Sequence, residues 1–170
     1  MLASTARGNE RATVNELLFL LKDALGDQEA QASKTGVRGL VVAKTSLDPY
    51  LTIEKLRELL NEKPYEFRFA LRIIPIEKVI PTSLEEIKKV ALEMAQRIDE
   101  KESFRVTLEK RLTTLHSNDI IGAAATDIQR KADMENPDKI LLIQVLGAFT
   151  GMSIVKPTGI ISVMKEKMVP

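Results

Sequence analysis

The sequence predicts a mixed α/β (α+β) fold, and three observations lead to this prediction. Segments with apolar residues at helical spacing are interspersed with short runs rich in valine and isoleucine, which are typical of buried strands. Residues that favour helix starts, such as Ser83 with Glu86, precede the helical segments. The 170 residues are 44% hydrophobic and 29% charged, an ordinary balance for a folded chain. A chain of this length has room for one domain or two small ones.

The first part of the chain predicts two helices. Thr13 with Glu16 resembles a capping box, and Gly26 follows the last apolar position, so a helix is expected between them, with an earlier start also open. A second helix is expected to begin at Asp48-Pro49, because proline is favoured at the first helical position. Strands are expected at residues 2–5 and 36–45, the second of which is rich in valine.

The middle of the chain predicts a half-exposed strand followed by a long helix. Apolar and charged residues alternate from Tyr65 to Arg72, and Pro75 indicates an edge, a bulge or the end of this strand. Ser83 and Glu86 then form a capping box, and the helix that they open has one apolar face. Its other, charged face is most simply a solvated surface. A domain boundary is expected between residues 61 and 83.

The last part of the chain returns to strands. Apolar residues alternate from Phe104 to Leu112, so this segment is expected to be a strand. Ser117 is expected to cap the next helix, with Asp119 in its first turn. Gly147 and Gly151 are expected to interrupt the chain between strands. Those later strands are expected at residues 140–146, 152–155 and 160–164.

Composition and motifs exclude several kinds of site. The chain has no cysteine and one histidine, so disulfides, thiolate metal sites and cysteine nucleophiles are absent from it. Neither GxxxxGK[ST], GxGxxG nor GxSxG occurs, and no apolar run approaches the ~18 residues of a membrane span. The N-terminus lacks the basic-then-apolar order of a signal peptide. We therefore expect a cytoplasmic protein with no catalytic residues, no metal and no cofactor.

The segment from Phe104 to Ser117 is the strongest candidate for a binding site. Lys110 and Arg111 end the expected strand, and His116 precedes the expected helix start. Helix N-termini bind phosphate oxygens through free backbone N–H groups, and arginine presents a planar fork that matches a phosphate. Because the net charge of the chain is only +1, an RNA-binding surface would have to be local. The same residues also fit an ordinary charged strand end.

Two long segments resemble a known family. ESFRVTLEKRLTTLHSNDII and ENPDKILLIQVLGAFTGMSIVKP resemble the heart of the THUMP domain, which is found in thiouridine synthases, RNA methyltransferases and pseudouridine synthases. LRIIPIEKVIPTSLEEI and the earlier LKDALGD and GVRGLVVAKTSLDPYLTIEKLREL resemble the subgroup that acts as an adaptor in tRNA cytidine acetylation. The resemblance covers roughly residues 15–157.

The resemblance implies a ferredoxin-like N-terminal region, residues 1–62, packed against a THUMP domain, residues 63–170. It implies a non-catalytic protein that recognises tRNA near the acceptor end and presents it to a separate enzyme. That enzyme would be a tRNA cytidine N4-acetyltransferase or another modification enzyme, since no further domain follows the THUMP-like segment. The RNA-binding residues carried over from the matching motifs are Arg72, Arg105, Lys110, Arg111, His116 and Lys156.

Two other functions remain open at this stage. The chain could be a protein-interaction scaffold in an RNA-processing complex without direct RNA contact, using the helix at residues 83–101 or the segment around Met164, Lys165 and Lys167. It could also be a small-ligand enzyme, which would require a deep pocket with strongly perturbed titratable groups.

Overall fold

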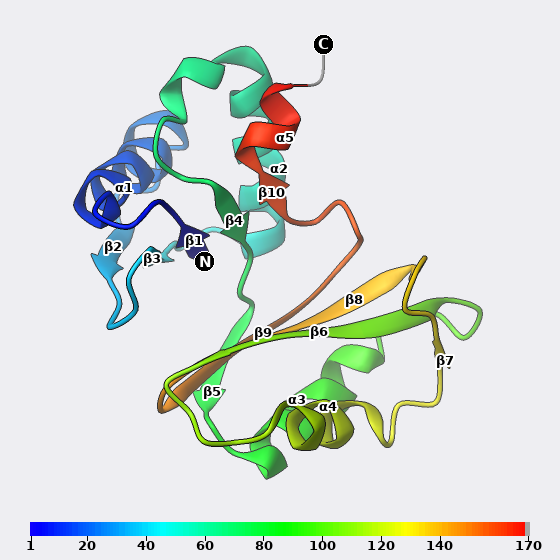
Figure 1. The fold of residues 1–170 in the computed structure, drawn as a ribbon. Coiled ribbons are helices and arrows are strands. Elements are labelled where there is room, and N and C mark those ends of the chain that lie inside the picture. The colour runs from blue at the N-terminus through cyan, green and yellow to red at the C-terminus, as the bar shows by residue number, and fades with distance from the viewer. Residues whose placement is uncertain (169–170) are drawn as a thin grey trace. The chain divides into compact units, whose positions relative to one another are not determined.

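Two five-stranded sheets organise the computed structural model, which describes residues 1–168 (Figure 1). Each sheet has its own helices and belongs to its own compact unit. Unit 1 comprises Met1–Pro75 and the chain from Gly159 onward, and unit 2 comprises Ile76–Thr158. The expected α+β fold class is therefore confirmed. No helix within residues 1–168 combines the length and the apolar character that crossing a membrane would need.

Unit 1 has an antiparallel sheet with the strand order β10-β4-β1-β3-β2. The sequence of elements β1-α1-β2-β3-α2-β4 is the split βαβ order of ferredoxin-like units. The bounds are β1 (Leu2–Ser4), α1 (Glu10–Leu18), the π-helical η1 (Phe19–Ala24), β2 (Gln31–Lys34), β3 (Leu40–Lys44), α2 (Pro49–Glu62), the 3-10 helix η2 (Pro64–Glu66), β4 (Arg72–Ile74), β10 (Ile161–Ser162) and α5 (Val163–Lys167).

Local chemistry fixes the helix starts of unit 1. The Asp48 carboxylate accepts hydrogen bonds from the backbone N–H groups of Tyr50 (2.9 Å) and Leu51 (3.0 Å), and Pro49 occupies the first turn, as expected. Helix α1 begins at Glu10, one turn before the expected capping box, and the Thr13 hydroxyl donates to the carbonyl of Asn9 inside the helix. The apolar faces of both helices pack against the sheet in one core.

The strand expected from Tyr65 to about Pro75 is confirmed only in its last part. Only Arg72–Ile74 are extended and paired, whereas Pro64–Glu66 form a 3-10 turn. The reason is a side chain far away in the sequence: the carboxylate of Glu16 accepts hydrogen bonds from the backbone N–H groups of Arg68, Phe69 and Ala70. These donors are therefore satisfied without a neighbouring strand.

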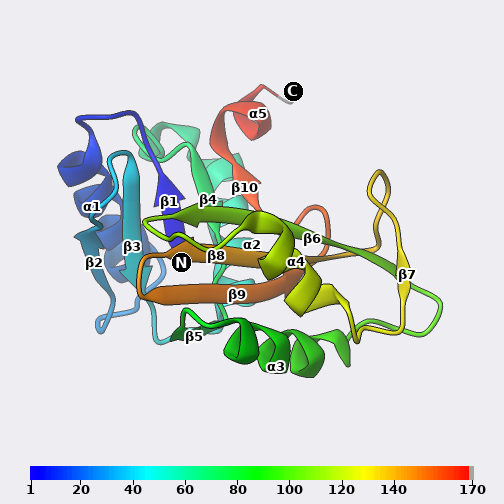
Figure 2. The same ribbon diagram turned by 60° about the horizontal axis from the view of Figure 1, so that its bottom comes forward.

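Unit 2 has a mixed sheet with the strand order β5-β9-β8-β6-β7, in which β6 runs parallel to β8 and β7. Helices α3 and α4 lie side by side on one face of this sheet (Figure 2). The bounds are β5 (Lys78–Pro81), α3 (Leu84–Ala95), β6 (Ser103–Arg111), α4 (Ser117–Ala125), β7 (Lys131–Ala132), β8 (Lys139–Leu146) and β9 (Phe149–Val155).

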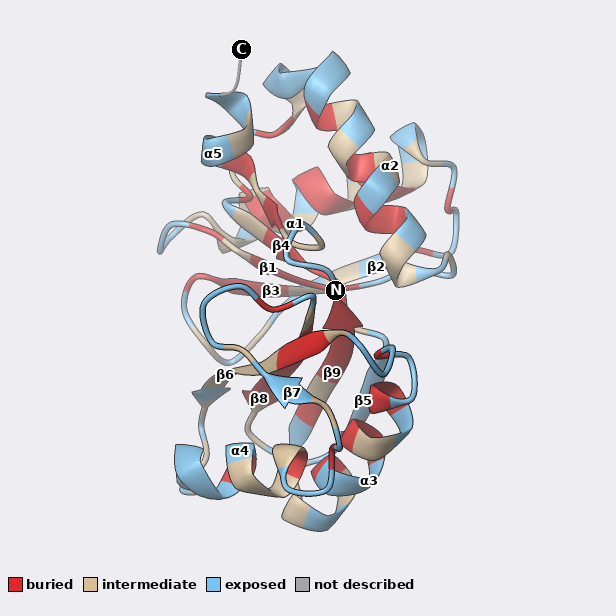
Figure 3. Cartoon of the chain, turned by 90° about the vertical axis from the view of Figure 1, so that its right-hand side faces the viewer, coloured by how far each residue is buried: buried red, intermediate tan, exposed pale blue. Residues whose placement is uncertain are grey.

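The core of unit 2 follows the two periodicities of its sequence. Alternate residues of β6 and β8 face the helices, and α3 turns one apolar stripe towards them, so each helix has a buried side and an exposed side (Figure 3). The Ser83 hydroxyl accepts a hydrogen bond from the N–H of Glu86 (3.3 Å), which confirms the expected start of α3. The residues of this core include Phe104, Val106, Leu108, Ile87, Val90, Met94, Ile120, Leu141, Ile143 and Val145.

Several expected boundaries differ from the structure. The short strands β2, β5 and β7 were not expected, because each is recognisable only through its partner strand. Helix α4 is preceded by His116 as its N-cap residue, so Ser117 is its first helical residue and does not cap it. The expected strand at residues 160–164 is limited to β10, after which the chain turns into α5.

The division of the chain into two units also differs from the expected one, which separated residues 1–62 from residues 63–170. Strand β4 pairs with β1, with Ile74 opposite Leu2, so residues 63–75 belong to unit 1. Strand β10 pairs with β4, with Ile161 opposite Ile73, which returns the end of the chain to unit 1. The chain thus leaves unit 1 after Pro75 and re-enters it at Gly159.

Gly151 lies within β9 and does not break it, and its lack of a side chain has a steric cause. A Cβ atom at this position would lie 2.9 Å from Cγ2 of Ile76 and 3.1 Å from its Cδ1. Gly151→Ala is therefore expected to lower the free energy of unfolding by about 1–3 kcal/mol, measured by chemical denaturation. Combining it with Ile76→Ala should recover part of this loss, and strictly additive effects of the two changes would contradict the steric explanation.

Candidate nucleic-acid interface

The end of β6 and the start of α4 are held together by one lysine. Lys110, the last residue but one of β6, is exposed, and its Nζ donates a hydrogen bond to the backbone carbonyl of Leu115 (2.8 Å). Leu115 directly precedes His116, whose backbone is extended (φ −78°, ψ 142°) before the helix begins. Because the acceptor is a carbonyl, this contact does not neutralise the charge of Lys110.

The loop between these elements is shaped by an unusual backbone conformation. Leu112 has a φ of 58°, in the left-handed region that costs a residue with a side chain roughly 1–2 kcal/mol. The backbone N–H of Gly147, in the turn between β8 and β9, donates to the carbonyl of Arg111 (2.9 Å) and so fastens that turn beside the loop. The β6–α4 loop and the β8–β9 turn therefore form one continuous surface, which we call the β6–α4 edge.

The helix start at this edge has free hydrogen-bond donors. His116 makes no side-chain cap, and its carbonyl accepts from the N–H groups of Asp119 and Ile120. Among residues 1–168, no acceptor binds the backbone N–H of Ser117 or Asn118, and both residues are exposed. Such N–H groups, with the positive end of the helix dipole, favour an anion. The carboxylate of Asp119 in the first turn opposes this tendency.

A second helix begins at the same sheet edge but does not favour an anion. The N–H of Thr82, next to the N-cap residue Ser83 of α3, donates to the carbonyl of Ala148 in the β8–β9 turn (2.9 Å). The first turn of α3 carries Glu85 and Glu86, whose charges already match the helix dipole. Phosphate binding is therefore favoured at α4 and not at α3.

Arg111 makes two side-chain contacts at the end of β6. Its guanidinium donates to Oε1 of Gln144 (2.9 Å) and to Oε2 of Glu109 (2.7 Å), and its side chain is only 19% exposed. The ion pair with Glu109 neutralises its charge, and the contact with Gln144 ties β6 to β8. Arg111 thus stabilises the strand end that presents Lys110, and it contributes less to the charge of the surface than the sequence suggested.

Two exposed apolar side chains border the β6–α4 edge. Leu112 is 68% exposed and Phe149 is 61% exposed. Phe149 begins β9 opposite Leu146, which is itself opposite Arg111, so the ring belongs to the same sheet end. Exposed aromatic rings provide stacking surfaces for unpaired nucleobases. Phe149 was not predicted from the sequence. It could have been found as an aromatic residue two positions after Gly147, which lies in a turn.

The other expected site residues lie elsewhere. Arg105 is five residues before Lys110 on an extended strand, about 16 Å away, and its Nη1 donates to the carbonyl of Met134. Lys156 is exposed and follows Val155, which is opposite Ile140 and therefore at the same sheet end as Arg105. Arg72 opens β4 in unit 1, between Ser4 and Ser162.

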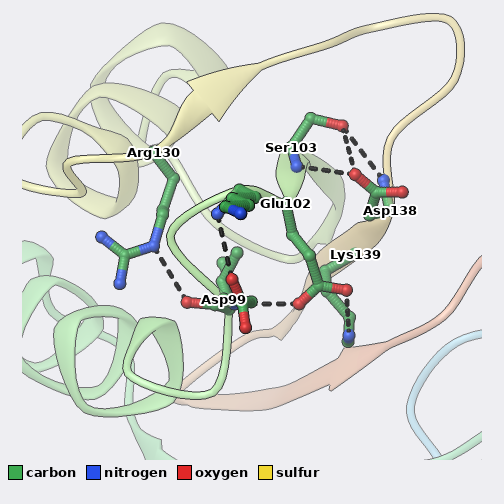
Figure 4. A network of polar contacts seen from close by, with 8 residues as sticks. Asp99, Glu102, Ser103, Arg130, Asp138 and Lys139 are labelled. Atoms are coloured by element: carbon green, nitrogen blue, oxygen red, sulfur yellow. Dashed lines mark hydrogen bonds and ion pairs between the residues drawn. The ribbon is translucent and has the colours of Figure 1, made fainter.

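A network of polar contacts, which includes the ion pair of Lys139 with Glu102, lies at the opposite end of the sheet, where β6 and β8 begin (Figure 4). Lys139 donates to the Glu102 carboxylate (2.7 Å), and this hydrogen bond is the largest cause that lowers the pKa of Glu102. The Asp138 carboxylate accepts from the backbone N–H (2.8 Å) and hydroxyl (3.1 Å) of Ser103. Arg130 donates through Nε to the carbonyl of Ile98 (2.9 Å). These contacts fasten the strand starts.

Four carboxylates among the described residues bind structural hydrogen-bond donors. The pKa values of Glu10, Asp27, Glu102 and Asp133 all lie below the usual range, because backbone or side-chain donors bind their carboxylates. Groups of this kind stay ionised at neutral pH and do not suit general acid catalysis. Within residues 1–168, no three His, Asp or Glu side chains lie close enough together to hold a metal ion.

Comparison with solved structures shows a shared fold. PH1313 from Pyrococcus horikoshii is 19% identical, with a TM-score of 0.63, and the match covers 91% of this chain and 54% of that one. TrmN from Thermus thermophilus is 18% identical, with a TM-score of 0.64, over 90% of this chain and 44% of that one. A 4-thiouridine synthetase, solved in complex with RNA and bound ATP, is 14% identical, with a TM-score of 0.52. The match covers 91% of this chain and 41% of that one.

This chain therefore spans about half the length of the solved structures that it matches, or less. No curated protein matches it. The sequence profile of the THUMP domain family, however, matches residues 81–155, which run from the end of β5 through α3, β6, α4 and β8 to the end of β9. The match includes the whole β6–α4 edge. The expected THUMP domain is thus confirmed: residues 81–155 of this chain are a THUMP domain.

Proposed function

We propose that this chain is a non-catalytic tRNA-binding protein that presents tRNA to a separate modification enzyme. The observation that carries the proposal is the β6–α4 edge, where the exposed Lys110 lies beside the start of α4. Within residues 1–168, Lys110 forms no ion pair, and the first N–H groups of α4 have no acceptor. This edge lies inside the THUMP domain. A structural neighbour, the 4-thiouridine synthetase, has been solved in complex with RNA, which supports RNA as the ligand class.

The chemistry of the edge suits the backbone of a folded RNA. Lys110 supplies a positive charge, and the N–H groups of Ser117 and Asn118 supply directed donors for phosphate oxygens. Phe149 offers a ring for an unpaired base, such as those near an acceptor end. Electrostatic contacts to phosphates would set the affinity, and the shape of the RNA would set the selectivity.

The adaptor role rests on two further points. The sequence resembles the adaptor subgroup of tRNA cytidine acetylation. The carboxylates with lowered pKa values accept hydrogen bonds, and groups that stay ionised in this way do not suit general acid catalysis. The chemistry is accordingly assigned to another protein, for which a tRNA cytidine N4-acetyltransferase is the proposed identity. A cytoplasmic location belongs to the same proposal.

A gel-shift titration with tRNA tests the site. Lys110→Ala combined with His116→Ala should weaken binding about tenfold, a loss of about 1.4 kcal/mol. The slope of log affinity against log salt, about −2 to −3 in the unmodified protein, should flatten by about one for the loss of Lys110. Lys89→Ala, an exposed cation on α3 with no partner among the described residues, is the matched control and should change neither quantity. A folded double variant with full affinity would rule out this site.

A protein-interaction scaffold is the second candidate function, and it is favoured by the surface of α5. Met164 is 58% exposed beside the exposed Lys165, while Lys167 is tied to the carbonyl of Phe67 (2.6 Å). A pull-down with purified acetyltransferase, repeated after nuclease treatment, distinguishes the two candidates. Equal recovery after nuclease, together with no direct tRNA binding, would favour the scaffold.

A further inference from the structure

A basic pocket in unit 1 lies outside the THUMP domain and has no assigned role. It has a volume of about 510 Å³ and is formed by two loops, one between β1 and α1 and the other between β2 and β3. Its lining is polar and charged, with Val37 as the one large apolar residue. The lining residues are Arg7, Gly8, Glu10, Lys34, Thr35, Gly36, Val37 and Arg38.

The two loops are fastened to each other by the carboxylate of Glu10. Its Oε2 accepts from the backbone N–H of Gly8 (2.9 Å), and its Oε1 accepts from that of Gly39 (2.9 Å). Gly8 directly follows Arg7, and Gly39 directly follows Arg38, so one carboxylate fixes the backbone at both arginines. Gly39 has a φ of 76°, and a Cβ atom there would lie 2.9 Å from the carbonyl oxygen of Thr5. This close approach makes the β2–β3 loop specific for glycine at this position.

The charges of the pocket are unbalanced. Arg7, Lys34 and Arg38 are exposed, and within residues 1–168 none of them forms an ion pair with a carboxylate. Glu10 is the one acidic residue of the lining, and backbone N–H groups occupy its oxygens. The pocket therefore retains an excess of positive charge, and its cations have donors without acceptors.

The type of donor limits the ligand. Guanidinium groups form paired hydrogen bonds with phosphate oxygens, and the lysine adds a point charge. The lining has no aromatic ring on which a base could stack. We propose that Arg7, Lys34 and Arg38 form a second anion-binding site, which takes phosphate groups and is held in shape by Glu10. The phosphates could belong to the RNA backbone, in which case the site deepens the proposed function, or to a small phosphorylated molecule.

The test uses the full chain with Arg7→Ala, Lys34→Ala and Arg38→Ala combined. A matched control, Lys55→Ala with Lys63→Ala and Arg68→Ala, removes the same charge from other surfaces of unit 1. Both variants are compared with the unmodified protein in salt-dependent tRNA binding and in calorimetric titration with inorganic pyrophosphate, after circular dichroism has established that they are folded.

Two outcomes support the site and identify its ligand. A loss of tRNA affinity of tenfold or more, with the salt slope flattened by about one to two and no effect of the control, assigns the site to the RNA backbone. Pyrophosphate binding by the unmodified protein that the pocket variant alone loses, with tRNA binding unchanged, assigns it to a small phosphorylated ligand. A folded pocket variant that matches the control in both measurements overturns the site.

The result is separable from the proposed function. If the pocket variant weakens tRNA binding while Lys110→Ala with His116→Ala does not, the unit 1 site stands and the β6–α4 edge is not the RNA contact. The reverse pattern removes the unit 1 site as an RNA contact and leaves the proposed function intact.

Discussion

Replacing Glu16 with alanine should lower the free energy of unfolding by about 3–5 kcal/mol. Glu16 is 9% exposed, and its Oε1 accepts from the N–H of Arg68 (2.6 Å) and Phe69 (3.0 Å), while its Oε2 accepts from that of Ala70 (2.8 Å). The alanine variant leaves these backbone donors without an acceptor, and each unpaired buried group costs about 1–3 kcal/mol. Water entering the gap would offset part of this cost, so the expected loss is smaller than the full sum.

Urea denaturation followed by circular dichroism measures this loss. Glu16→Gln keeps one oxygen acceptor and should lose less than Glu16→Ala. Glu58→Ala removes an exposed glutamate from α2 and should change the free energy of unfolding by less than about 0.5 kcal/mol. If Glu16→Ala behaves like Glu58→Ala, the carboxylate does not hold the segment at residues 67–70.

Acidification from pH 5 to pH 2 should remove about 2 kcal/mol of stability through Asp27 alone. Its pKa is lowered from 3.8 to about 2, first by the Ser46 hydroxyl and then by the Thr45 hydroxyl, each 2.6 Å from a carboxylate oxygen. A lowered pKa means that the folded protein holds the ionised form more strongly than the unfolded chain does. The stabilisation is therefore complete above the unfolded pKa and is lost as the pH falls through about 2.

The contribution of Asp27 is isolated by comparing pH profiles. Asp27→Asn cannot ionise, so the difference in unfolding free energy between the unmodified protein and this variant should shrink by about 2 kcal/mol between pH 5 and pH 2. Other carboxylates titrate in both proteins and cancel in the difference. A constant difference for Asp27→Asn would show that its hydrogen bonds do not favour the ionised form.

Features with local causes could be predicted from the sequence. Asp48 and Ser83 cap helices through backbone groups two or three residues away, so the starts of α2 and α3 are visible in short windows. The alternation in β6 and the apolar run of β8 likewise indicated strands. The first part of the strand expected from residue 65 was wrong, because the backbone of residues 68–70 binds Glu16, more than fifty positions earlier.

The candidate sites also combine residues that are close in the chain with residues that only the fold brings together. Lys110 and His116 are close in the chain, and the structure keeps them close. The neutralised charge of Arg111 could not be anticipated in full, because Gln144 lies on a neighbouring strand. The cluster of Arg7, Lys34 and Arg38 was missed for the same reason, since its two loops meet only through Glu10. Residues brought together by pairing across a sheet leave no signal in a short window.

The return of the chain to unit 1 sets an order for folding during synthesis. The fifth strand of the unit 1 sheet, β10, follows the whole of unit 2 in the chain. While the ribosome is still making unit 2, β4 is an open sheet edge. Ile73 is paired with Ala3 of β1 on one side, but its partner on the other side, Ile161, has not yet been added. Domains commonly complete their folding in the order of their synthesis. In this chain the sheet of unit 1, which is synthesised first, would be completed last. Until then one edge of β4 would stay unpaired while the THUMP domain is translated.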